Sequence, residues 1–173
     1  MGNRRYQNTF EKAELKASDE ELRLDEESVV LAVGGARGIT ASVCTQIAKE
    51  SGCRFIVLGK SPLSNSVENP DQQPVTFEDA RQALIDDCKN KGKRIIPAEI
   101  ERAAWNRVWE SERVLNMAKL AEHGAEALYR QCDITRQEEI EKLVREIWDS
   151  YGRLDLVLQG GGVLVERLSL IHI

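Results

Sequence analysis

The sequence has few of the residues that build metal sites and disulfide frameworks. Aromatic residues make up 5% of its 173 positions, and it holds two histidines and four cysteines. No two cysteines form a Cys-x-x-Cys pair, so we expect no zinc site and assign no metal-ligating residue. Disulfides are rare in the cytosol, and we interpret all four cysteines as reduced thiols. They are Cys44, Cys53, Cys88 and Cys132.

Long apolar runs and concentrated positive charge are absent as well. No stretch approaches the roughly 20 apolar residues that a membrane helix needs, and the first residues lack the apolar core of a signal peptide. Gly2 does not fit a myristoylation signal, because Tyr6 stands where Ser or Thr is required. The net charge is −5 and the basic residues are scattered among acids, which argues against nucleic-acid binding. We therefore predict a cytoplasmic protein that binds neither membranes nor nucleic acid.

What the sequence does contain is an alternation of apolar runs and amphipathic stretches. Residues 1–27 are polar and charged, which predicts a linker or a loosely docked helix before a domain over residues 28–173. Four short apolar runs predict buried parallel strands. Strands that alternate with helices indicate an α/β fold, here a Rossmann-like parallel sheet with flanking helices and right-handed crossovers. The predicted strands cover residues 28–33, 54–58, 127–132 and 154–159.

The connection between the second and third predicted strands is long and helical. This insert covers about residues 62–123 and begins as a proline-rich surface loop. Thr76 would cap its first helix, over residues 77–91, with an acid in the reciprocal capping position. Pro97 would begin a second helix that runs to about His123.

Apolar residues at helical spacing identify the faces that we expect to be buried. Two further helices are predicted, over residues 39–51 and 136–150. We assign the pair Trp105 and Trp109 to core or domain contact rather than to a cofactor site. The residues expected to face the core are Ile39, Val43, Ile47 and Ala48 in the first helix and Ala104, Val108, Leu115 and Ala118 in the insert.

A glycine-rich turn follows the first predicted strand. A diphosphate can approach the backbone where side chains are absent, and the N–H groups and positive dipole end of the next helix point at it. Gly34, Gly35 and Gly38 supply this turn, and Ile39 opens the helix. Its position between a strand and a helix, at the start of a βαβ unit, favours a dinucleotide site. The alternative is a plain tight turn.

Two cations indicate which dinucleotide would bind. Proteins that prefer NAD usually place an acid at the end of the second strand, to bind the ribose 2′-hydroxyl. This chain has Gly59, Lys60 and Ser61 there instead. Lys60 and Arg37 would pair with a 2′-phosphate, and the Ser61 hydroxyl could add a hydrogen bond. We therefore predict NADPH as the cofactor; the alternative is that both cations are solvated surface charges.

Two further segments complete the predicted site. Asp133 and Ile134 follow the third strand, where a carboxylate can accept a hydrogen bond from an adenine amino group. Gly160 and Gly161 follow the fourth strand, where bare backbone can lie against the adenosine ribose. All of these segments stand at the C-terminal ends of consecutive strands, which is the edge where open parallel sheets bind ligands.

These motifs resemble the short-chain dehydrogenase/reductase family, and more narrowly the ketoreductase domains of polyketide and polyunsaturated fatty-acid synthases. The resemblance covers about residues 28–168. The helical insert is its most discriminating part, because simple reductases of the family have a short connection there. The stretches that carry it are VGGARGIT at 33–40, FIVLGKSPL at 55–63, AEIERAAWNRVW at 98–109, YRQCDIT at 129–135 and GRLDLVLQGGGV at 152–163.

The resemblance implies a β-ketoacyl reductase. Such an enzyme transfers hydride from NADPH to the β-carbonyl of an acyl chain held on an acyl carrier protein, beside the other domains of a multidomain synthase. In that family a Tyr donates the proton, a Lys lowers its pKa and a Ser holds the carbonyl, all beyond the glycines of the fourth strand. We assign no catalytic residue in this chain, and we expect it to be a fragment, without the C-terminal half of the domain, that is inactive alone.

Two other functions remain open. One is a non-catalytic Rossmann half-domain that serves as a structural or nucleotide-binding unit, and the glycine turn argues against a purely structural role. The other is a stand-alone dehydrogenase of small alcohols or steroids, against which the large insert argues. The chain also departs from the family pattern: Thr40 replaces the third glycine, Lys60 stands where Arg is more usual, and Gln159 replaces His or Asn. These departures bear on the strength of cofactor binding more than on the fold.

Overall fold

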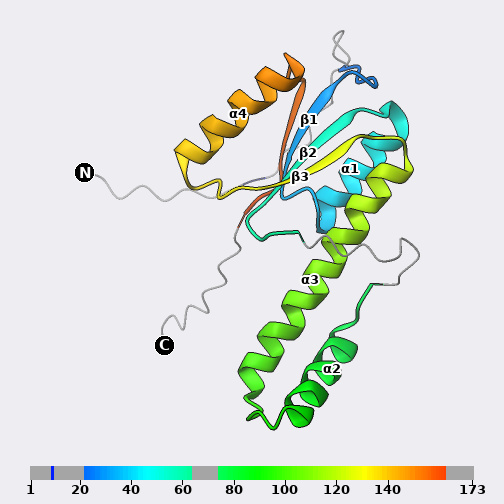
Figure 1. Cartoon of the computed structure of the whole chain (residues 1–173). Coiled ribbons are helices and arrows are strands. Elements are labelled where there is room, and N and C mark those ends of the chain that lie inside the picture. The colour runs from blue at the N-terminus through cyan, green and yellow to red at the C-terminus, as the bar shows by residue number, and fades with distance from the viewer. Residues whose placement is uncertain (1–8, 10–21, 64–73, 163–173) are drawn as a thin grey trace.

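Four parallel strands form the sheet at the centre of the molecule. A computed structural model describes residues 9, 22–63 and 74–162. Most of the predicted linker at 1–27 and all residues after 162 therefore lie outside the described residues. The strands lie in the order β3–β2–β1–β4 (Figure 1). Their bounds are β1 Val29–Val33, β2 Arg54–Gly59, β3 Ala127–Gln131 and β4 Leu156–Gln159.

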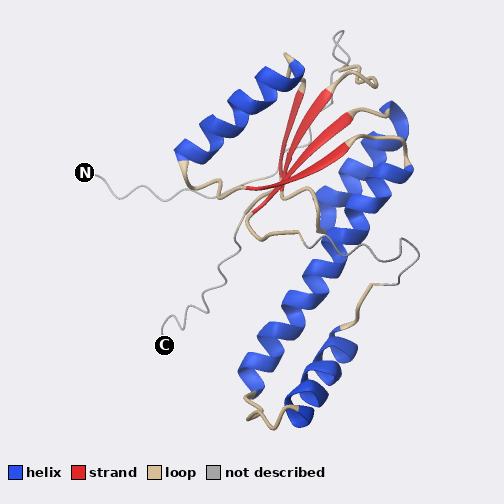
Figure 2. Ribbon diagram, in the orientation of Figure 1, coloured by secondary structure: helices blue, strands red, loops and turns tan. Residues whose placement is uncertain are grey.

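Helices cover both faces of this sheet. In Figure 2, α1 and α3 lie on one face and α4 lies on the other, while α2 and the first part of α3 extend away from the sheet as a hairpin. None of the helices in the described part of the chain is long and apolar enough to cross a membrane. Their bounds are α1 Gly38–Ser51, α2 Phe77–Asn90, α3 Pro97–Glu122 and α4 Gln137–Tyr151.

Alternate residues of β1 and β2 build two separate cores. On one face, Val30 and Phe55 pack under α1 and α3; on the other, Val29 and Ile56 pack under α4. All four side chains are buried. The prediction of strands buried on both faces is therefore confirmed for the two central strands. Strands β3 and β4 lie at the sheet edges in the described residues and are only partly buried.

Local signals set the helix ends as the sequence predicts. The Asp79 N–H donates to the Thr76 hydroxyl oxygen at 3.2 Å, and the Thr76 hydroxyl donates to the Asp79 carboxylate at 2.7 Å, which confirms the reciprocal cap of α2. Pro97 lies in the first turn of α3. Gly52 ends α1 in the left-handed region at φ 63°, a conformation that glycine adopts without steric cost.

The predicted inner face of α1 is wrong at two positions. Ile39 is 85% exposed and Val43 is 41% exposed. The helix instead lies against the sheet through Ala41, Cys44 and Ala48, because small side chains let helix and sheet approach closely. Of the expected core residues, Ala48 is buried and Ile47 is half-buried.

The inner face of α3 is partly as predicted. Ala104 is buried, while Val108, Leu115 and Ala118 are half-buried. The other buried positions of α3 are Ile100, Met117 and Leu120. Of the two alternatives for Trp105 and Trp109, core or domain contact, the structure excludes the core, since they are 45% and 37% exposed. They stack on one another at 6.0 Å between ring centroids, and Phe77 of α2 lies 4.7 Å from Trp105, so the aromatic residues join the two insert helices.

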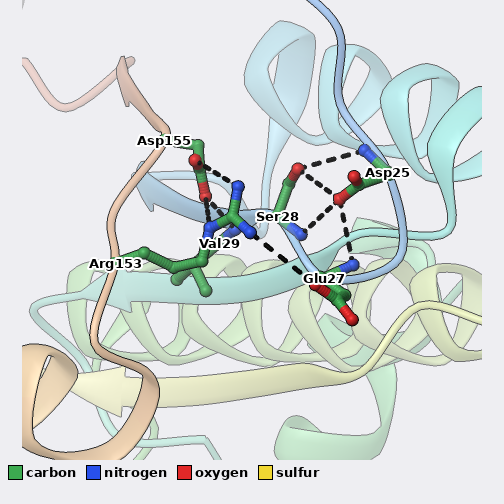
Figure 3. Close-up of polar contacts among 6 residues, drawn as sticks. All are labelled: Asp25, Glu27, Ser28, Val29, Arg153 and Asp155. Atoms are coloured by element: carbon green, nitrogen blue, oxygen red, sulfur yellow. Dashed lines mark hydrogen bonds and ion pairs between the residues drawn. The ribbon is translucent and has the colours of Figure 1, made fainter.

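A polar cluster fixes β1 against β4 at the N-terminal ends of these strands (Figure 3). The Asp155 carboxylate accepts a hydrogen bond from the Val29 N–H at 2.8 Å and two from the Arg153 guanidinium at 2.9 and 2.8 Å. These contacts lower the pKa of Asp155, with Arg153 as the main cause. Ser28, although only 1% exposed, donates its hydroxyl to the Asp25 carboxylate at 2.7 Å. Every buried polar group of this cluster thus has a partner.

Candidate cofactor-binding site

The structure brings the predicted site segments to one edge of the sheet. Because the strands are parallel, Val33 at the end of β1 pairs with Leu58 of β2 and with Gln159 of β4. The Gly34 N–H donates to the Leu58 carbonyl at 2.8 Å, and the Gly160 N–H donates to the Val33 carbonyl at 3.0 Å. The loops after β1, β2 and β4 therefore leave the sheet side by side.

The glycine turn is built so that side chains would not fit. Gly34 has φ +72°, and a Cβ there would lie 3.2 Å from the backbone of Gly160 and Gly161. A Cβ on Gly35 would lie 2.6 Å from the Cβ of Ala32. These two glycines let the turn close over the sheet edge, and α1 begins directly after it at Gly38.

The side chain of Thr40, near the start of α1, is accommodated by Gly160. A Cβ built on Gly160 would overlap the Thr40 side chain. The absence of a side chain at Gly160, at the end of β4, thus leaves room for Thr40. This pairing explains how a β-branched residue fits where α1 and β4 come together.

Strand β3 holds the loop after β2 in place. The Tyr129 hydroxyl donates to the Ser61 carbonyl at 2.6 Å, and the Gln131 amide donates to the Lys60 carbonyl at 3.0 Å. Burial raises the pKa of Tyr129, so its hydroxyl keeps the proton that it donates. The backbone that carries Lys60 is therefore fixed, while the Lys60 side chain is 77% exposed. The Ser61 residue is exposed as well.

Lys60 pairs with a carboxylate although its side chain is mostly exposed. Its Nζ atom lies 3.0 Å from Oδ2 of Asp133. The other carboxylate oxygen of Asp133 accepts from the Thr135 hydroxyl at 2.7 Å and from the Thr135 N–H at 3.1 Å. The Thr135 hydroxyl first, and then Lys60, lower the pKa of Asp133 to about 2. Ile134, the other predicted residue of this segment, is 39% exposed.

Arg37 also meets a carboxylate, and this one comes from the insert. The Arg37 Nε atom lies 3.3 Å from Oε2 of Glu112 in α3, and the Arg37 guanidinium lies 4.7 Å from the ring centroid of Trp109. Oε1 of Glu112 accepts a hydrogen bond from the Gly38 N–H at 2.9 Å. The Asn116 amide donates to the Ala36 carbonyl at 3.0 Å. Helix α3 therefore contacts the glycine turn directly.

Sequence reasoning did not identify Glu112, Asn116, Tyr129 or Gln131 as part of this site. Glu112 is 74 residues away from its backbone partner, and nothing in its local pattern separates it from other helical acids. For Tyr129 and Gln131 a signal exists, because residues two apart on a strand share a face. Both could have been expected to lie on one side of β3, next to the loop after β2.

The chemistry of this edge is suited to an anion. The N-terminal N–H groups of α1 carry partial positive charge; Arg37 lies in the turn itself, and Lys60 follows the neighbouring strand β2. Within the described residues, no group of three or more His, Cys, Asp or Glu side chains is placed to hold a metal ion. The arrangement can therefore hold a phosphorylated ligand through backbone N–H groups and cations.

Comparison with known proteins gives consistent results. A family model described as short chain dehydrogenase matches residues 93–172. A polyunsaturated fatty acid synthase subunit from Thraustochytrium sp. is 25% identical over 170 residues, which covers 92% of this chain and 6% of that protein. The crystal structure of an N-terminal ketoreductase from the macrolactin assembly line superposes with a TM-score of 0.51 and 20% identity, over 88% of this chain and 21% of that chain.

The fold and the glycine edge define a Rossmann-like unit. Over residues 93–172 the chain is similar to the short-chain dehydrogenase family, and its fold is similar to that of the assembly-line ketoreductase. It spans 21% of the ketoreductase chain and 6% of the length of the synthase subunit.

Proposed function

We propose that this chain is the NADPH-binding part of a β-ketoacyl reductase domain in a polyketide or fatty-acid synthase. The observation that carries the proposal is the convergence of the glycine turn, the N-terminus of α1, Arg37 and Lys60 at one sheet edge. Together these groups offer backbone N–H donors to a diphosphate and cations to a further phosphate.

The choice of NADPH over NADH rests on the end of β2. Gly59 ends that strand, and Lys60 follows in place of an acid. An acid there would accept the ribose 2′-hydroxyl of NADH and repel the 2′-phosphate of NADPH. Lys60 is mostly exposed, so its ammonium can leave Asp133 and pair with the 2′-phosphate, while Tyr129 and Gln131 keep its backbone fixed.

The described residues bind and orient; they do not transfer the proton. NADPH, when bound, supplies the hydride that reduces a carbonyl to an alcohol. Thr40 and Gly160 keep α1 close to β4, and the turn at Gly34 brings bare backbone to the ligand. The assembly-line ketoreductase and the fatty acid synthase both belong to multidomain systems, which supports the proposal that an acyl carrier protein and further domains are the partners.

The test compares the two nicotinamide cofactors by calorimetric titration. We expect NADPH to bind more tightly than NADH. The variant Lys60→Glu should weaken NADPH binding about tenfold or more, because a hydrogen bond to a charged group contributes about 1.5–3 kcal/mol. Lys142→Glu in α4 makes the same charge change away from the site and should leave binding nearly unchanged. Equal affinities for NADPH and NADH in the parent protein would contradict the proposed selectivity.

A non-catalytic structural role is the second candidate, and one observation favours it. Both predicted cations are already paired with carboxylates of the chain, Lys60 with Asp133 and Arg37 with Glu112. A unit that only braces a neighbouring domain would need no exposed anion site. Folded protein that binds neither NADPH nor NADH would support this candidate over the first.

A further inference from the structure

Glu112 occupies the place that the proposed function gives to a cofactor phosphate. Its two carboxylate oxygens bind separate groups of the site: Oε1 accepts from the Gly38 N–H at 2.9 Å, and Oε2 lies 3.3 Å from the Arg37 Nε atom. One group is the backbone donor at the start of α1, and the other is a cation of the turn. A carboxylate therefore contacts both kinds of group that would hold a phosphate.

The N-terminus of α1 has no other anion of its own. The N-cap residue Arg37 makes no side-chain capping bond, and the first turn of the helix contains no acidic residue. Unsatisfied N–H groups and the helix dipole favour a negative charge at this position. Glu112 supplies that charge from another element, α3, and so satisfies the helix end in the absence of ligand.

The insert holds Glu112 in position by contacts on both sides of it. One turn before it, Trp109 stacks under the Arg37 guanidinium at 4.7 Å. One turn after it, the Asn116 amide donates to the Ala36 carbonyl at 3.0 Å. These contacts keep α3 on the turn independently of Glu112. Because the Glu112 side chain is 37% exposed, it can turn into solvent while the helix stays in place.

We propose that Glu112 is a competitor for the cofactor phosphate, built into the insert, that has to leave its site when the dinucleotide binds. The inference rests on the proposed function for the identity of the ligand. The single Gly38 N–H cannot serve a carboxylate and a phosphate at once, and two anions held beside the same helix end repel one another. Glu112 thus lowers the affinity of the site for anions and determines how tightly the cofactor is held.

The test uses Glu112→Gln and two probes, NADPH and inorganic pyrophosphate. Affinity is measured by calorimetry, and the Gly38 amide signal is followed by NMR in isotope-labelled protein. The amide of Gln can still accept from the Gly38 N–H but carries no charge, so α3 should stay docked, which circular dichroism and the melting temperature will check. We expect both probes to bind about three- to tenfold more tightly to the variant, with a shift of the Gly38 signal. The gain should shrink as salt is added, because salt screens the repulsion.

The matched control is Glu110→Gln on the same helix. Glu110 makes no hydrogen bond or ion pair among the described residues, so this variant changes the net charge equally without freeing the turn. An equal gain in both variants would reduce the effect to net charge and overturn the inference. Unchanged affinity for both probes in Glu112→Gln, or no binding of either probe to any variant, would overturn it as well. If pyrophosphate binds more tightly to Glu112→Gln while NADPH binds to neither protein, the competitor role of Glu112 stands and the proposed function fails.

Discussion

The pairing of Thr40 with Gly160 gives the sharpest test of the packing at the site. A Cβ on Gly160 would overlap the Thr40 side chain, and the Gly160 N–H also bonds the Val33 carbonyl at 3.0 Å. Inserting a methyl group into such a contact costs about 1–3 kcal/mol. We therefore expect Gly160→Ala to lower the free energy of unfolding by that amount, measured by urea denaturation followed by circular dichroism.

The double variant separates this contact from other effects of the alanine. Thr40→Gly alone should cost about 0.3–0.5 kcal/mol in helix propensity, because glycine is about 1 kcal/mol and threonine up to about 0.7 kcal/mol less favourable than alanine in a helix. If the two residues clash, Gly160→Ala should cost almost nothing once Thr40 is glycine, which gives a coupling energy of about 1–3 kcal/mol. Gly162→Ala is the matched control, because a Cβ there meets no atom within 4 Å. Additive effects of the two substitutions would refute the reasoning.

Two further predictions concern the loop after β2. The pKa of Asp133 is lowered to about 2 in the folded chain, against about 3.9 for a free Asp. Its carboxylate therefore stabilises the fold above about pH 4, and this contribution is lost as the pH falls through 2. Asp133→Asn should lower the unfolding midpoint in urea at pH 7, with a difference that disappears near pH 2; a constant difference would contradict this. Tyr129→Phe removes the bond to the Ser61 carbonyl and should cost about 0.5–1.5 kcal/mol in urea denaturation. It should also weaken NADPH binding more than NADH binding, and an equal effect on both would show that Tyr129 does not position Lys60.

The positions of strands and helices could be predicted because their signals are local. Apolar runs, the Thr76 cap and Pro97 each act within a few residues, and the structure has them where the sequence indicates. The buried face of α1 was predicted wrongly because large apolar residues were taken as the inner face. Ile39 and Val43 point outward, and small residues make the contact with the sheet.

The partners of the two predicted cations could not be found in the same way. Arg37 meets Glu112 across 75 positions of sequence, and Lys60 meets Asp133 across a strand pair. Both contacts depend on the strand order and on where α3 crosses the turn, and neither is encoded in a short motif. Sequence therefore identified Arg37, Lys60 and Asp133 as site residues, but neither the pairing of Lys60 with Asp133 nor the presence of Glu112 beside Arg37.

The polar cluster at the N-terminal ends of β1 and β4 has a consequence for the distant glycine edge. If β4 slipped by one residue relative to β1, every side chain of β4 would turn to the opposite face of the sheet. Asp155 prevents this, because its carboxylate binds the Val29 N–H and the Arg153 guanidinium at once. The register that Asp155 fixes is kept along the four residues of β4, a length of about 13 Å at the usual rise per residue. It therefore determines the position of Gly160 beside Gly34. The precision of the glycine edge is thus determined at the opposite end of the sheet.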